Sequence, residues 1–188
     1  MQYPNLQKLA QHILVTGYSG SGKSTLAAQL ASELGLPIHK LDDDPNVRAY
    51  FKNPNNFVFS KEDPEAVTAL NNMVQNVKAL SEPHIVEGTQ VAYVPEYWPG
   101  NRLIYVDTPP TQVVRQRLAR DRAKGKDVSP GSTKARQRAL IAKLLIKEME
   151  QPFNDVQAYP EVERMRPNRE FAKKLMEELR KERASRVA

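Results

Sequence analysis

A glycine-rich segment, residues 17–25, carries residue types that bind phosphate groups. It reads Gly-Tyr-Ser-Gly-Ser-Gly-Lys-Ser-Thr, which matches the pattern G-x-x-x-x-G-K-[ST]. Glycines in such a loop take backbone angles closed to other residues, so successive N–H groups turn towards phosphate oxygens. The lysine reaches the β- and γ-phosphates, and the next hydroxyl ligates magnesium. The segment therefore predicts a site for ATP and Mg²⁺.

The context of this segment strengthens the prediction. An apolar run, residues 13–15, precedes it and a helix-forming run, residues 26–31, follows it, as a strand, a turn and a helix start require. Lys23 is also predicted to act in catalysis and Ser24 to bind the metal. The residues predicted to bind the nucleotide are Gly17, Ser19, Gly20, Ser21, Gly22, Lys23, Ser24 and Thr25.

Carboxylates follow two further apolar runs, where the carboxyl ends of parallel strands would bring them to the phosphate loop. Asp42 begins an Asp-Asp-Asp-Pro sequence and is the favoured catalytic base, because it lies nearest the strand end. An acidic helix cap or turn is the alternative for these aspartates, since proline follows. Glu87 is predicted to hold the magnesium shell, and a structural hydrogen-bond acceptor at a turn is the alternative for it.

Four arginines occupy the helix predicted to start at Thr111, at positions 115, 117, 120 and 122. At 100° per residue, Arg115 and Arg122 lie on one line and Arg117 and Arg120 lie on the far side. Only one pair can therefore face the phosphates. The basic glycine-containing segment at 123–126 suits closure over a triphosphate.

The alternation of apolar runs with helical patterns predicts a three-layer α/β/α fold with a parallel sheet of four to five strands. Strands are expected at 12–16, 37–41, 84–86 and 102–106, and helices at 64–80, from 111, at 135–150 and up to about 186. The aromatic stretch 46–62 is expected to be a loop that either covers a ligand or anchors itself to the core. An irregular stretch without a convincing strand is expected over 151–167.

The chain of 188 residues fits a single domain, with a lid at about 115–132 and a helical C-terminal region at about 133–188. It contains no cysteine, which excludes thiolate chemistry, and it has no signal pattern or membrane-length apolar run. We expect a cytoplasmic protein without a membrane partner. The net charge of +6 is compatible with nucleic-acid binding, but mixed charges at helical spacing favour solvated helix faces.

Several stretches in the same order resemble the uridine kinase and phosphoribulokinase group of P-loop kinases, over roughly residues 12–126. Besides the phosphate loop and the aspartate after the second strand, they are Phe-Ser-Lys-Glu-Asp-Pro-Glu-Ala at 59–66, Ile-Val-Glu-Gly at 85–88, Ile-Tyr-Val-Asp at 104–107 and Arg-Leu-Ala-Arg-Asp at 117–121. The resemblance implies transfer of the γ-phosphoryl group of ATP to an alcohol. It matches Asp42 to the catalytic base, and Arg117 and Arg120 to the helix that leads into the lid.

The leading hypothesis is thus a magnesium-dependent kinase with ATP and a small hydroxylated substrate, such as a nucleoside or a sugar, as its partners. A nucleoside monophosphate kinase, whose acceptor is a phosphate and which needs no base, is the alternative. A nucleotide-dependent nucleic-acid-binding or regulatory protein is the second alternative. Neither the acceptor nor the oligomeric state follows from the sequence.

Overall fold

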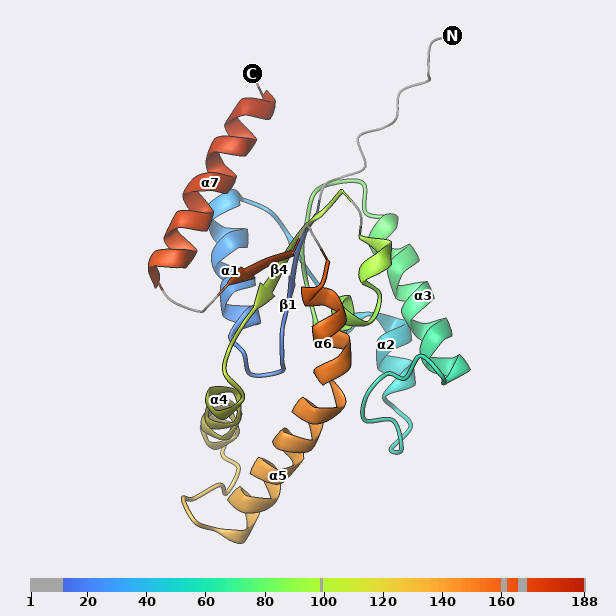
Figure 1. Cartoon of the computed structure of the whole chain (residues 1–188), viewed down its shortest axis with the longest axis vertical. Helices are drawn as coiled ribbons and strands as arrows, with labels where there is room; N and C mark the ends of the chain where they lie inside the picture. The colour runs from blue at the N-terminus through green and yellow to red at the C-terminus, as the bar shows by residue number, and fades with distance from the viewer. Residues whose placement is uncertain (1–11, 99, 160–161, 166–168, 188) are drawn as a thin grey trace.

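Five short strands pair in parallel to form the middle layer of the computed structural model (Figure 1). They are β1 (Ile13–Thr16), β2 (Ile38–Lys40), β3 (Ile85–Glu87), β4 (Arg102–Val106) and β5 (Val162–Met165), in the spatial order β2-β3-β1-β4-β5. The structure describes residues 12–98, 100–159, 162–165 and 169–187. Residues 1–11, for which the sequence favours a short leader before the first strand, lie outside the described residues.

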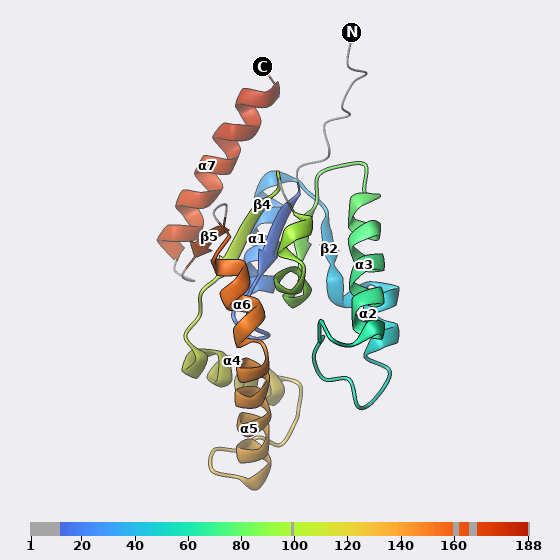
Figure 2. The same cartoon turned by 45° about the vertical axis from the view of Figure 1, so that its right-hand side comes forward.

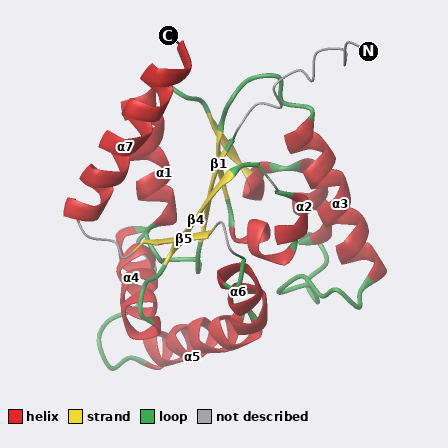
Figure 3. Ribbon diagram, turned by 45° about the horizontal axis from the view of Figure 1, so that its top comes forward, coloured by secondary structure: helices red, strands yellow, loops and turns green. Residues whose placement is uncertain are grey.

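Alternate side chains of the central strands enter two separate cores, because successive residues of a strand point to opposite faces. Ile13 and Val15 pack against α1 (Lys23–Leu34) and α7 (Arg169–Val187). Leu14 enters the second core, on the opposite face, whose helices are α2 (Pro45–Tyr50), α3 (Pro64–Lys78) and α6 (Glu150–Gln157). Figure 3 shows the strands running between these two groups of helices, which confirms the predicted three-layer fold.

Two further helices, α4 (Pro110–Ala123) and α5 (Thr133–Glu148), lie beyond one end of the sheet (Figure 2). They follow β4 in the chain and extend from the end at which the strands finish. No helix in the described part of the chain is long and apolar enough to cross a membrane.

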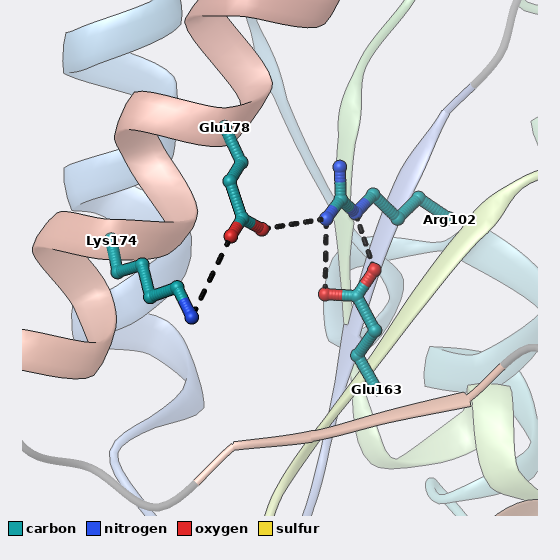
Figure 4. Close-up of polar contacts among 4 residues, drawn as sticks. All are labelled: Arg102, Glu163, Lys174 and Glu178. Carbon is teal, nitrogen blue, oxygen red and sulfur yellow. Dashed lines mark hydrogen bonds and ion pairs between the residues drawn. The ribbon is translucent and has the colours of Figure 1, made fainter.

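The fifth strand is a correction to the sequence prediction, which expected an irregular stretch over 151–167. That stretch contains most of α6 and all of β5, which pairs with β4 in register Leu103 to Val162. Its sequence, Val-Glu-Arg-Met, has no apolar run. Glu163 instead receives two hydrogen bonds from Arg102, at 2.6 and 3.2 Å, and Glu178 of α7 lies 3.7 Å from the same guanidinium (Figure 4). Charge pairing thus joins β5 and α7 to the sheet.

The second correction concerns residues 46–62, which were expected to form a loop. Their first part belongs to α2, because Asp44 caps this helix and Pro45 occupies its first turn. The next helix, α3, is capped by Asp63, whose side chain accepts a hydrogen bond from the N–H of Glu65.

Candidate functional site

The glycine-rich loop connects the carboxyl end of β1 to the first turn of α1, as its sequence predicts. The loop turns tightly, with the N–H of Ser21 donating to the carbonyl of Tyr18 at 2.9 Å. Thr108, just after β4, donates from its hydroxyl to the carbonyl of Ser21 at 2.7 Å and ties the loop to the sheet. Gly20 has a φ of 97°, and a Cβ there would lie 2.6 Å from Cγ of Arg117. Glycine at this position is therefore needed both for the turn and for the arginine beside it.

Lys23, Ser24 and Glu87 meet at the start of α1. The carboxylate oxygen Oε1 of Glu87 lies 3.5 Å from Nζ of Lys23 and accepts a hydrogen bond from the Ser24 hydroxyl at 3.0 Å. Lys23 and Glu87 are both buried, at 6% and 5% exposure. Each member of this buried pair stabilises the other, so Glu87 holds the side chain of Lys23 in place at the start of α1.

The same residues fit the magnesium ion that the loop pattern implies. Mg²⁺ prefers oxygen ligands and is usually held by one or two protein groups together with substrate phosphates and water. The Ser24 hydroxyl and the Glu87 carboxylate are adjacent and supply such oxygens. The described residues contain no cluster of three or more acidic, histidine or cysteine side chains that could hold a metal by themselves. The donor set therefore suits an ion that arrives with a nucleotide.

The three consecutive aspartates have three different environments. Asp42 is exposed and accepts a hydrogen bond from Nε2 of Gln90 at 2.7 Å. Asp43 is exposed and pairs with Arg48 at 2.5 Å. Asp44 is buried and receives hydrogen bonds from the N–H of Asn46 and the amide of Asn76, each at 2.8 Å.

These environments assign one of the aspartates a structural role. Asp44 caps α2, and although burial opposes its charge, the hydrogen bonds from Asn76 and Asn46 hold its pKa below the ordinary value. The alternative of an acidic helix cap therefore applies to Asp44. Asp42 is the aspartate that lines the cavity next to the phosphate loop, so it alone of the three is placed to meet a second substrate.

Gln90 is a residue that the sequence analysis did not single out. It is 2% exposed, and its amide nitrogen is bonded to Asp42. A Cβ on Gly88 would lie 2.3 Å from Oε1 of Gln90 and 2.8 Å from Cβ of Leu41, so a glycine there leaves room for the glutamine. The Glu-Gly pair at 87–88 thus serves two neighbours, because its carboxylate contacts Lys23 and its glycine accommodates Gln90.

A cavity of about 190 Å³ joins these groups. Ser19 and Lys23 of the loop line it together with Asp42, Gln90 and Arg117. Aromatic side chains from the segment after α2 line it as well. The cavity therefore lies between the phosphate loop, the carboxylate after β2 and an aromatic wall.

Of Arg117 and Arg120, which share one side of α4, only Arg117 is among the described residues that line this cavity. Arg117 is half-buried, lines the cavity and packs against Gly20. Burial and the positive charge of Arg120 lower the pKa of Arg117. Arg120 is exposed and is not among the lining residues, and Arg122 donates to the carbonyl of Val128 at 3.2 Å. Of the four arginines, the structure brings Arg117 to the site.

Comparison with known proteins gives the family and the fold. Residues 13–138 match the AAA domain family (AAA_18), which is more than half of the chain. A shikimate kinase of Rhodopirellula baltica is 37% identical over 76 residues, which span 37% of this chain and 41% of that relative. The chain thus matches about two fifths of the length of this relative.

Solved structures of kinases share the fold. A gluconokinase from Sinorhizobium meliloti 1021 superposes with a TM-score of 0.58 at 16% identity, over 93% of this chain and 98% of the other. A shikimate kinase from Acinetobacter baumannii in complex with shikimate gives 0.55 at 17% identity, over 94% of each chain. Neither of these is a uridine kinase, and the resemblance to that group stays a prediction.

Proposed function

The chain belongs to the AAA domain family, and from that premise we propose that it is a kinase that transfers the γ-phosphoryl group of ATP to a hydroxyl of a small metabolite. A nucleoside, a sugar or a related compound is the acceptor class. The observation that carries the proposal is the shared cavity of Lys23, from the phosphate loop, and Asp42, from the end of β2. A donor phosphate held by the loop and an acceptor hydroxyl at the carboxylate would meet in this cavity.

Each group has a role in the transfer. Asp42 accepts the proton of the acceptor hydroxyl as its oxygen attacks the γ-phosphorus. The bond from that phosphorus to the bridging oxygen breaks, and ADP leaves with the bond's electron pair. Lys23, the loop N–H groups and Arg117 offset negative charge on the transferring group, and Arg120 joins them from the same helix face when the lid closes.

Ser24 and Glu87 would hold Mg²⁺ at the start of α1. When bound, this ion offsets the charge of the β- and γ-phosphates and orients them. Lys23 leaves Glu87 for the phosphates as the nucleotide binds, because both carboxylate and phosphate compete for the same ammonium group. Phosphoryl transfer needs positioning and charge compensation more than covalent help, and the chain supplies both.

The experiment that tests this proposal measures ADP release from ATP and Mg²⁺. The panel contains nucleosides, nucleoside monophosphates, neutral sugars and the acids shikimate and gluconate, which the relatives' names suggest. Stimulation by at least one compound, abolished in Lys23→Ala, is the expected result. ADP release that no compound stimulates, at a rate equal to that of Lys23→Ala, would contradict the proposal.

A further inference from the structure

We call the part of the cavity that contains Asp42 and the aromatic side chains its acceptor end, as distinct from the part formed by the phosphate loop. Phe59 is 5% exposed, and its ring contacts those of Tyr93 and Phe51 at centroid distances of 5.5 and 4.9 Å. Tyr18, on the loop side, packs edge-on against Phe153 at 4.4 Å. Phe59 therefore anchors the aromatic segment to the core, and Phe59, Phe51 and Phe57 line the cavity. That the segment covers a ligand stays a prediction.

One ring of this wall is left largely uncovered. Phe57 lines the cavity and is 75% exposed, whereas Phe59 of the same wall is buried. Leu145 and Ile146 of α5 also line the cavity. A flat ring bound against these apolar side chains would remove apolar surface from water.

The cations of the cavity lie on the phosphate side. Of the described residues that line it, Lys23 and Arg117 carry positive charge. Lys23 is paired with Glu87, and Arg117 packs against the loop at Gly20. Both are therefore committed to the donor nucleotide, and the acceptor end offers hydroxyls, an amide and the carboxylate of Asp42.

This end of the cavity is also unfavourable for an anion. Burial raises the pKa of Tyr93 to about 12, so the wall resists the formation of negative charge on its own tyrosine. A carboxylate or phosphate on the acceptor would lose its hydration here without gaining a cation, and it would be repelled by Asp42.

We propose that the acceptor is an uncharged alcohol built on a flat or apolar ring, and that acidic and phosphorylated acceptors are rejected. This inference rests on the proposed kinase function and narrows its acceptor class. The proposed acceptor class differs from that of a nucleoside monophosphate kinase, whose acceptor is a phosphate. It also differs from the acids that the names gluconokinase and shikimate kinase suggest for proteins of the same fold.

The test compares matched pairs of acceptors, each pair sharing one ring: a nucleoside with its monophosphate, and a neutral cyclic polyol with the corresponding carboxylic acid. The kcat/KM for the neutral member is expected to exceed that of the charged member by at least about tenfold, because burial of an unpaired charge is costly. Equal or better use of the charged members would overturn the inference while leaving the kinase function intact. Absence of stimulation by every compound would instead contradict the kinase function itself, and the acceptor class with it.

A surface variant tests the ring contact separately. Phe57→Ala is expected to raise the KM for the ring-bearing acceptor roughly fivefold, as the loss of one ring-stacking contact implies, with the KM for ATP unchanged. Ile141→Ala is the matched control, because Ile141 is an apolar residue of α5 that is 53% exposed and does not line the cavity. An equal acceptor KM for both variants and the unmodified protein would overturn the role of the aromatic wall.

Discussion

Gln90 donates a hydrogen bond from Nε2 to Oδ1 of Asp42 over 2.7 Å and so joins two residues 48 positions apart in the chain. The other oxygen of the carboxylate is left for an acceptor hydroxyl. The glutamine therefore fixes the orientation of the proposed base, which lines the cavity.

Replacement of Gln90 by leucine should therefore slow turnover without weakening nucleotide binding. We expect kcat to fall about 10- to 100-fold, the range for loss of a hydrogen bond to a charged group, and the KM for ATP to stay within about twofold. Steady-state kinetics with both substrates varied would measure this.

A second variant distinguishes positioning from a structural effect. Gln90→Glu keeps the length of the side chain but replaces the amide donor by a second acceptor, so it should lower kcat at least as much as Gln90→Leu, with the KM for ATP within about twofold. Full activity in both variants would show that the hydrogen bond has no part in catalysis.

Variants of the adjacent residues Asp42 and Asp43 form a matched pair that tests which aspartate is the catalytic base. Asp42→Asn should lower kcat by at least about 100-fold while ATP binding persists, because the amide cannot accept the proton. Asp43→Asn should keep turnover within about twofold, because Asp43 pairs with the exposed Arg48 and is absent from the cavity lining. Equal activities of the two variants would contradict the role of Asp42.

Protonation of His12 and His39 should make the protein less stable in acid. His12 and His39 both lie near His84, with ring centroids 6.0 and 6.5 Å from it. Burial first, and the charge of His84 second, lower the pKa of His12 and His39 below 6.5, while Asp43 and Asp44 partly oppose this at His39. Folding therefore favours the neutral rings, and this stability is fully present above pH 6.5 and is lost as the pH falls through the lowered values.

Urea unfolding at about pH 7.5 and about pH 5.5 would measure this loss. The free energy of unfolding should be smaller at the lower pH, and the difference should shrink in His12→Gln, which retains an acceptor for the N–H of His84 that now bonds His12 at 3.2 Å. The same pH difference in the variant and the unmodified protein would rule out His12 as its source.

The Arg102 cluster of Figure 4 should stabilise the C-terminal part of the fold. Arg102→Leu is expected to lower the free energy of unfolding by about 1–3 kcal/mol, because the fork of hydrogen bonds to Glu163 joins β4 to β5. Lys174→Leu is the control and should change it by less than about 0.5 kcal/mol, because the pair of Lys174 with Glu178 is exposed and 4.0 Å long. Urea midpoints for the two variants that did not differ would contradict this ranking.

The parts of the fold that follow from the sequence are those with strong local patterns. The run Arg-Leu-Ile-Tyr-Val at 102–106 forms β4 as predicted, because a buried parallel strand needs a continuous apolar sequence. β5 was missed because its sequence has no apolar run and because Glu163 within it pairs with Arg102, about 60 residues earlier. In the same way, α2 was missed because aspartate followed by proline is typical of turns as well as of helix starts.

In the candidate site too, the contiguous motif could be predicted from the sequence, whereas the roles that depend on distant partners could not. The loop from Gly17 to Thr25 is a contiguous motif, so its position between β1 and α1 could be predicted from its order alone. The separate environments of Asp42, Asp43 and Asp44 arise from partners at Gln90, Arg48 and Asn76. Gln90 and Asn76 lie 48 and 32 residues from their aspartates, and no local pattern connects such distant residues, so the choice among the aspartates required the structure.

The central claim is that the phosphoryl group passes to an alcohol and not to water. The most direct measurement uses ATP labelled in its γ-phosphate and follows the label after turnover with a ring-bearing neutral acceptor. The label should be recovered in an ester of the acceptor, and Asp42→Asn should abolish this product while the protein still binds ATP. Recovery of the label only as inorganic phosphate, at the same rate with and without every acceptor, would contradict it.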